Sequence, residues 1–313
     1  MNTQSNAMPD SFEAQRVAPA VLTATQPLYW SVRRELWENR WIVIGQLAVA
    51  GVYLFAYLIS LAHLPTLMRN LSAQDPMHHM EGIAAIAMPY DIAAGVMMLT
   101  LILMSVFYAA DALHGERRDR SILFWKSLPV SDLTTVLAKA VVLLVVLPLL
   151  TFAVTVAMHI IMLLLNSVVL AANGMSVVSL WSELSIFTMW GQMLYHLVTA
   201  HALWPFPVFC WLLLVSGWAR RATLLWAALP VVAIAGIEKL VFNTSYFIAT
   251  VGIRLIGGGA PTDFSPGQMM PFGPMTHLTP FRFLGAPGLW MGFIFAAACL
   301  AVAVRLRRYQ GPI

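Results

Sequence analysis

Long apolar runs alternate with short polar segments along almost the whole chain. Six of these runs approach the length of about 20 residues that an α-helix needs to cross the hydrocarbon core of a membrane. The spans that we expect from them are 41–62, 92–110, 140–165, 192–218, 222–242 and 286–304. The pattern therefore predicts an all-α integral membrane protein with six transmembrane helices, which together form one domain over residues 41–308.

The polar stretch before the first span divides into two parts. Residues 1–26 have no basic start followed by a sustained apolar run, so we expect a disordered cytosolic tail and not a signal peptide. Residues 27–40 place tryptophans at steps of seven and four, which put them on one face of a helix. Tryptophan together with arginine is typical of the headgroup region. We predict an interfacial amphipathic helix carrying Trp30, Arg33, Arg34, Trp37 and Trp41; the alternative is a helix that only lengthens the first span.

The segments between the later spans differ in character. We expect residues 63–90 to form an exposed loop and 166–190 a short amphipathic external segment. Residues 243–285 are rich in glycine and proline and contain an apolar piece too short to cross. Within the spans, Pro148 predicts a kink in the third, and prolines and histidines make the fourth irregular.

Composition agrees with the membrane interpretation. The chain is 60% hydrophobic and 10% charged, against about 25% charged residues in soluble domains. The formal net charge of +4 comes from basic residues dispersed at span ends, which excludes a concentrated nucleic-acid-binding patch. Both cysteines, Cys210 and Cys299, lie in apolar runs, so neither a disulfide framework nor a zinc site is indicated.

The distribution of lysine and arginine predicts the orientation. Of the 18 basic residues, only Arg69, Lys239, Arg254 and Arg282 fall on one side of the expected spans, and the other fourteen fall on the opposite side. Because positive charge is retained on the cytoplasmic side of membranes, we expect both termini to be cytoplasmic. The predicted location is a bacterial cytoplasmic (inner) membrane, with the chain crossing it several times.

Residues 111–132, which we call the charged segment, are the one long charged insertion. A single arginine or aspartate at the bilayer centre costs roughly 2.5–3.5 kcal/mol, so this segment must protrude into water. It also carries an apolar cluster over 122–128. We predict a short cytosolic helix over 120–128, capped at its start by Asp119 and stopped by Pro129. The alternative is a solvated loop whose charges only set the topology.

Several chemistries are missing from the sequence. None of the lysines follows a glycine, so the chain has no phosphate-binding loop of the G-x-x-x-x-G-K-[ST] type. His196 and His201 are five residues apart and are expected to be buried histidines rather than metal ligands. Glu238 and Lys239 lie at a span end, where a role in setting topology is expected. No catalytic set stands out, and we expect a chain that is not an enzyme and holds no cofactor.

One short run offers metal-binding groups. Met77, His78, His79 and Met80 combine thioether and imidazole side chains, which suit copper. Methionine is frequent throughout the chain, with 18 in all, so a chance cluster is the preferred interpretation and the metal site is only a weak candidate.

The charged segment resembles part of a known family. Glu116 ahead of residues 120–124, then 127–131, then Lys139 opening a long span, is similar to the cytosolic loop between the second and third spans of ABC type-2 permeases, the membrane subunits of ATP-binding-cassette exporters. The order of an interfacial helix, six spans and cytoplasmic termini is similar too. Many family members have Gly-Thr where this chain has Arg120 and Ser121.

This resemblance implies partners and a role. In that family a short coupling helix docks into a separate ATPase subunit, which binds ATP and Mg²⁺, and two permease chains form the translocation path as a homodimer or heterodimer surrounded by lipid. Carried onto this chain, the resemblance implies these coupling residues: Glu116, Arg117, Arg118, Asp119, Arg120, Phe124, Trp125, Leu128 and Pro129.

Three other functions remain open at the level of the sequence. One is a stand-alone secondary carrier or channel, and another is a permease serving copper metalloprotein maturation. An intramembrane enzyme is the least favoured.

Overall fold

The structure is a computed structural model, which describes residues 26–73, 76–127, 130–257 and 280–310. All regular elements within these residues are helices, in agreement with the predicted all-α class. Five helices are long and apolar enough to cross a membrane, or six if one bent pair forms a single span. This indicates a multi-pass membrane protein, as the sequence predicted.

The candidate spans follow the predicted ones closely. They cover Trp41–Arg69, Ala84–Arg118, Asp132–Ala172, Thr223–Phe242 and Pro287–Tyr309, with the bent pair at Leu180–Leu203 and Phe206–Trp218. The two members of the bent pair meet at 43°. The predicted irregularity of the fourth span is therefore confirmed.

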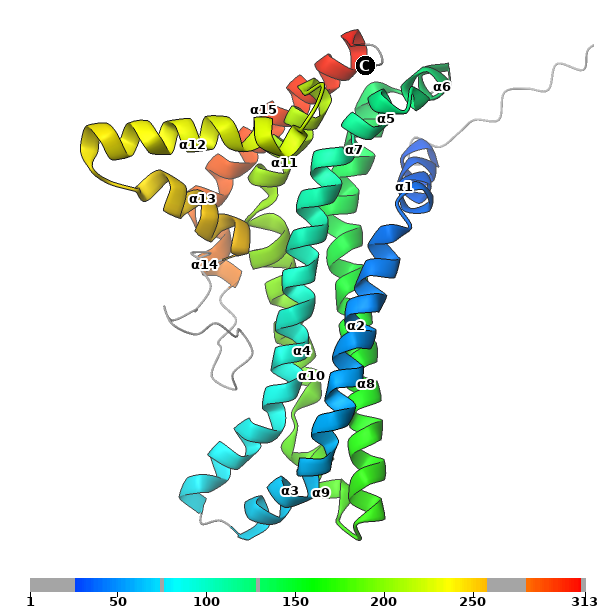
Figure 1. The fold of residues 1–313 in the computed structure, drawn as a ribbon, viewed down its shortest axis with the longest axis vertical. Helices are drawn as coiled ribbons and strands as arrows, with labels where there is room; N and C mark the ends of the chain where they lie inside the picture. The colour runs from blue at the N-terminus through cyan, green and yellow to red at the C-terminus, as the bar shows by residue number, and fades with distance from the viewer. Residues whose placement is uncertain (1–25, 74–75, 128–129, 258–279, 311–313) are drawn as a thin grey trace, which may run out of the picture.

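Four long helical stretches run side by side along the long axis of the molecule (Figure 1). They are α2 (Trp41–Ser60), α4 (Pro76–Asp111), α7 (Asp132–Val141) continued by α8 (Leu147–Ala172), and α10 (Ile186–His196) followed by α11 (Phe206–Trp218). The last helix, α15 (Pro287–Tyr309), packs mainly against α11.

The two ends of this bundle differ. Helix α1 (Gln26–Glu38), the short helices α5 (His114–Arg118) and α6 (Ser121–Ser127), and the end of α15 gather at one end (Figure 1). This end carries the described basic residues that we assigned to the cytosol, and we call it the basic end. Helices α3 (Leu64–Ala73) and α9 (Val177–Glu183) lie at the opposite end.

The prediction of an exposed loop over 63–90 is wrong. A 3-10 turn, η1 (Leu61–His63), leads from α2 directly into α3, and α4 begins at Pro76. The buried side chains of Leu61, Leu64 and Met68 recur at steps of three and four and pack in one cluster with Ile86. That helical spacing explains why the segment folds back onto the bundle.

The expected external segment 166–190 is also only partly right. Helix α8 continues to Ala172, and only α9 is a separate short helix. The distortion expected at Pro148 takes the form of a π-helical segment, η2 (Val142–Val146), just ahead of it. Pro148 follows this segment directly within one continuous helix, so the wider π turn accommodates its missing N–H.

The break in the bent pair combines two features. A second π-helical segment, η3 (Leu197–Leu203), precedes Pro205, and α11 starts directly after this proline. Arg254, on the short apolar helix α13 (Tyr246–Ile256), donates from Nε to the Trp204 carbonyl at 2.8 Å and from Nη2 to the Gly288 carbonyl at 3.2 Å. Arg254 therefore supplies the break with hydrogen bonds and ties it to the start of α15.

Helix α12 (Thr223–Phe242) forms where the fifth span was predicted, but it lies across the long axis of the bundle with α13 beneath it (Figure 1). Its apolar side chains are mostly exposed, as Leu240 at 88% and Leu225 at 65% show. The other short element in this part of the chain is α14 (Pro280–Leu284).

Candidate functional site: a charged segment rooted in a buried ion cluster

The charged segment folds into two short helices instead of one. Helix α5 ends at Arg118, with Asp119 at its C-terminal cap, so the prediction that Asp119 caps the following helix is wrong. Arg120 then adopts a left-handed conformation with φ of 58°, and α6 begins at Ser121. Glycine adopts this conformation without strain, whereas an arginine does not. Leu128 and Pro129 lie outside the described residues.

The side chains of this segment divide into an exposed and a buried set. Leu123 and Phe124 are 58% and 60% exposed, and Arg118, Asp119 and Arg120 also face solvent. The buried set consists of Leu113, Glu116, Arg117 and Ile122. The coupling residues implied by the family resemblance therefore differ in their surroundings. Only the exposed ones are accessible to a partner.

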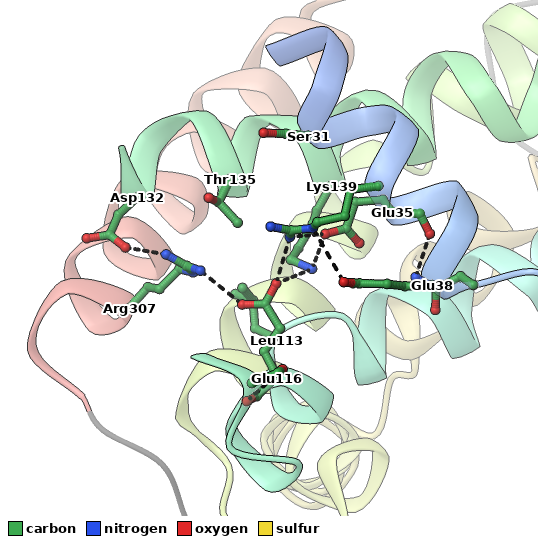
Figure 2. Close-up of polar contacts among 12 residues, drawn as sticks. Ser31, Glu35, Glu38, Leu113, Glu116, Asp132, Thr135, Lys139 and Arg307 are labelled. Atoms are coloured by element: carbon green, nitrogen blue, oxygen red, sulfur yellow. Dashed lines mark hydrogen bonds and ion pairs between the residues drawn. The ribbon is translucent and has the colours of Figure 1, made fainter. Parts of the chain in front are cut away.

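Glu116 belongs to a buried ion cluster, which Figure 2 shows. The Lys139 ammonium on α7 lies 2.8 Å from Oε1 of Glu35 on α1 and 3.0 Å from Oε1 of Glu116. All three side chains are buried. Glu35 also accepts a hydrogen bond at 3.0 Å from the Tyr108 hydroxyl on α4.

The other carboxylate oxygen of Glu116 binds the last helix. Arg307 on α15 places Nη2 3.1 Å from Oε2 of Glu116, and its Nη1 donates to the Asp132 carboxylate at the start of α7. In Figure 2, Arg307 lies between Asp132 and Glu116, with Lys139 on the far side of Glu116. Helices α5, α7 and α15 thus meet at one carboxylate.

Arg34 completes the cluster from the interfacial helix. Its Nη2 lies 2.8 Å from Oε1 of Glu35 and 3.2 Å from Oε1 of Glu116. The guanidinium also lies over the Trp125 ring, 4.1 Å from the centroid. Arg34, Lys139 and Arg307 balance the acids Glu35, Glu116 and Asp132, and such pairing is what offsets the cost of removing ions from water.

Further hydrogen bonds join the charged segment to the end of α11. Arg117 donates from Nη1 to the Gly217 carbonyl at 2.7 Å, and the His114 ring nitrogen Nδ1 lies 3.2 Å from the Ala219 carbonyl. On the outer side, Lys126 donates to the Gln310 carbonyl at 3.1 Å. A force on the exposed side of this segment would therefore reach α1, α7, α11 and α15 through direct contacts.

A helix, α1, forms where the interfacial helix was predicted. Trp30 and Trp37 are exposed at 58% and 62%, and the guanidinium of Arg33 lies 5.3 Å from the Trp30 ring centroid. Trp41 begins α2. The exposed tryptophan face fits the prediction, but Arg34 and Glu35 turn inward and serve the ion cluster instead.

Sequence reasoning did not single out Glu35, Asp132, Lys139 and Arg307 as a set. Lys139 carried the clearest signal, since it is a lysine within a stretch that is otherwise apolar for many residues. An ion in such surroundings requires a partner. Which acid provides it depends on helices distant in the chain.

Glu238 makes local contacts that the sequence did not indicate. Its carboxylate accepts hydrogen bonds from the Thr244 hydroxyl at 2.7 Å and from the amides of Tyr246 and Phe247 at 2.8 and 2.9 Å. Glu238 thus caps the first turn of α13.

The candidate metal ligands remain untested. The side chains of Met77, His78, His79 and Met80 lie outside the described ones. Among the described residues, no group of three or more histidine, cysteine or acidic side chains is placed to hold a metal. His196 and His201 are buried, as expected.

A second polar network lies nearer the opposite end, and it is neutral. Asn166 on α8 accepts from the Tyr57 hydroxyl at 2.7 Å and donates to the Tyr90 hydroxyl at 2.8 Å. His159 accepts from Trp190 Nε1 at 3.1 Å on its Nδ1, so its Nε2 carries the proton that meets the Tyr90 carbonyl at 3.1 Å. We call this set the neutral network.

Comparison with protein-family models, with curated proteins and with solved structures gives no match for the chain.

Proposed function

We propose that the chain is the membrane-spanning permease subunit of an ATP-binding-cassette exporter in a bacterial cytoplasmic membrane. A separate ATPase subunit would drive it through the charged segment. The observation that carries this proposal is a segment with an exposed apolar and charged side, whose other side is fixed in an ion cluster shared by several helices.

The exposed side has the composition of a protein-binding patch. Leu123 and Phe124 supply apolar area, and Arg118, Asp119 and Arg120 surround them with charge. Interfaces commonly combine a few such buried anchors with a polar rim. Trp125 is held under Arg34 and contributes to the support of α6, so Leu123 and Phe124 are the better candidates for direct contact.

The buried side supports transmission of movement. Glu116 binds Lys139 on α7 and Arg307 on α15, while α4 leads into α5. A displacement of the charged segment would therefore move the spans on either side of it together. This is the mechanical requirement for coupling nucleotide-driven closure of a partner to rearrangement of a membrane bundle.

The partners follow from what the chain lacks. Its sequence holds no phosphate-binding loop, so ATP and Mg²⁺ belong to the ATPase subunit. The exposed apolar surface of α12 and the outer bundle faces lipid or a second permease chain, with which this chain would complete a translocation path as a homodimer or heterodimer.

Co-purification tests the proposal. The tagged full chain is extracted from its native membrane, and the ATP hydrolysis recovered with it is measured for the wild type and for Leu123→Ala combined with Phe124→Ala. We expect the ATP hydrolysis recovered with the variant to fall at least about tenfold, because buried anchors contribute about 2 kcal/mol or more to binding. The unfolding temperature of the chain should not change.

The matched control is Val178→Ala combined with Phe187→Ala, which removes side chains that are 75% and 85% exposed at the opposite end. This control should retain the ATPase. Equal loss in both variants, or transport by the purified chain alone on an ion gradient without ATP, would refute the proposal and favour a stand-alone carrier.

A further inference from the structure

A cavity of about 330 Å³ opens between α11, α12 and α15 at the basic end of the bundle. Every side chain that lines it is apolar; Trp211, Trp218, Trp226, Leu229, Val302 and Leu306 form most of its wall. Its volume lies near the lower end of the range of about 300–1,000 Å³ that is usual for ligand sites.

The course of α12 creates this cavity. Ala222, with φ of 49°, turns the chain so that α12 leaves the bundle axis (Figure 1). The near part of α12 stays attached to α11, because Trp211 Nε1 donates to the Ala227 carbonyl at 3.1 Å and the rings of Trp218 and Trp226 stack edge to face at 5.3 Å. Trp211, Trp218 and Trp226 all line the cavity, so these contacts support its shape.

Three exposed arginines lie close in the chain to residues that line the cavity. Arg220 and Arg221 are exposed in the turn between Trp218 and Trp226, and Arg305 is exposed on α15 one turn beyond Val302. None of these three arginines forms an ion pair with a residue that the structure describes. In this they differ from Arg34 and Arg307, whose charges the ion cluster neutralises.

We propose that this cavity binds an acyl chain of an anionic phospholipid whose phosphate contacts Arg220 and Arg221. An apolar cavity fits a hydrocarbon chain. Tryptophans are enriched at the headgroup level of membranes, and basic pockets between transmembrane helices bind anionic headgroups. A soluble anion would not occupy the apolar cavity, and an uncharged amphiphile would not pair with the arginines. The inference depends on the cavity and these arginines, and it does not require the proposed transport role.

The site also touches the charged segment. Arg117 donates to the carbonyls of Gly217 and of Ala219, the residue directly before Arg220. Arg220 therefore adds a positive charge close to Arg117, and a phosphate bound at Arg220 would offset that charge. Lipid occupancy would therefore stabilise the turn that holds the charged segment against α11.

Native mass spectrometry of the purified full chain tests the proposal. The chain is titrated with phosphatidylglycerol and, separately, with phosphatidylcholine of the same acyl chains. We expect phosphatidylglycerol to bind more tightly to the wild type, and Arg220→Gln combined with Arg221→Gln to weaken it roughly 30-fold, since each arginine near an anionic surface contributes about 1 kcal/mol. Phosphatidylcholine binding should not change.

Two further variants make the result specific. Arg118→Gln combined with Arg120→Gln removes the same charge from the same end and should leave phosphatidylglycerol binding intact. Leu229→Trp fills the cavity with the arginines in place and should weaken binding, with thermal unfolding showing that the variant is folded. Equal weakening by the control pair, no effect of Leu229→Trp in a folded protein, or displacement of the lipid by inorganic phosphate would each overturn the proposal.

Discussion

The ion cluster and the neutral network hold the same bundle in opposite ways. The ion cluster joins α1, α5, α7 and α15 through six charged side chains at the basic end. The neutral network joins α2, α4, α8 and α10 through tyrosine, asparagine, histidine and tryptophan. Lys139 and Asn166 lie about 40 Å apart along the continuous α7–α8 helix, at about 1.5 Å per residue.

The difference shows where each kind of contact is useful. Neutral hydrogen bonds between helices give modest stability without burying a net charge, and they suit the apolar length of the bundle. A buried ion cluster costs more to assemble and fails more sharply when one member is removed. The ion cluster holds the buried side of the charged segment, where a fixed geometry matters most to the proposed coupling.

The largest effect is expected from Lys139→Met. It removes the ammonium between Glu35 and Glu116 and leaves two buried carboxylates facing each other. Breaking a buried pair costs about 3–5 kcal/mol, so the unfolding free energy in detergent should fall by that order. Adding Glu35→Gln should recover part of the loss. Lys126→Met, at an exposed lysine, serves as the control, and an equally small effect of both lysine variants would contradict the role of the cluster.

A smaller effect is expected from Asn166→Leu. The substitution breaks the hydrogen bonds to Tyr57 and Tyr90 in the neutral network. We expect a loss of about 1–2 kcal/mol in unfolding free energy, because neutral hydrogen bonds between membrane helices contribute about this much at most. Ser167→Ala, at a half-buried position, removes a bond within α8 and one accepted from Trp181 on α9, and it should cost less. A loss as large as that of Lys139→Met would remove the distinction between the two networks.

The left-handed residue between α5 and α6 provides a change of opposite sign. Arg120→Gly should raise stability by up to about 1 kcal/mol, because glycine adopts a positive φ without the steric cost that other residues incur. Arg118→Gly, at a helical position, should lower it. Thermal unfolding and amide hydrogen exchange in 114–127 would measure both, and equal signs would show that the turn at Arg120 is not strained.

The smallest effect concerns Glu38 at the edge of the ion cluster. Burial raises the pKa of the Glu38 carboxyl above its ordinary value, although Arg34, 3.6 Å away, opposes this. A raised pKa in the folded state means that folding disfavours ionisation, so the stabilising contribution is present at low pH and is lost as pH rises through the folded-state pKa. Glu38→Gln should therefore be slightly more stable than the wild type at neutral pH. This gain in stability should vanish in acid. A gain that instead grew in acid would contradict a raised pKa of the Glu38 carboxyl.

Particular residues show how far the sequence could be interpreted. The steps between Trp30, Trp37 and Trp41 located α1, and the charges of 111–132 located the segment between the second and third spans. The prediction of a loop over 63–90 was wrong because polar residues obscured the helical spacing of Leu61, Leu64 and Met68. The division of the charged segment at Arg120 was missed because local preference disfavours a left-handed arginine.

The sequence by itself determined that the chain is helical and has several apolar helices of membrane-spanning length, because a backbone in hydrocarbon must satisfy its hydrogen bonds internally. Only the tertiary structure decided which charges are buried. Arg117 and Arg118 are adjacent and chemically identical, yet one is buried against α11 and the other is exposed. Glu116 is buried because Lys139 and Arg307, from helices distant in the chain, neutralise it there.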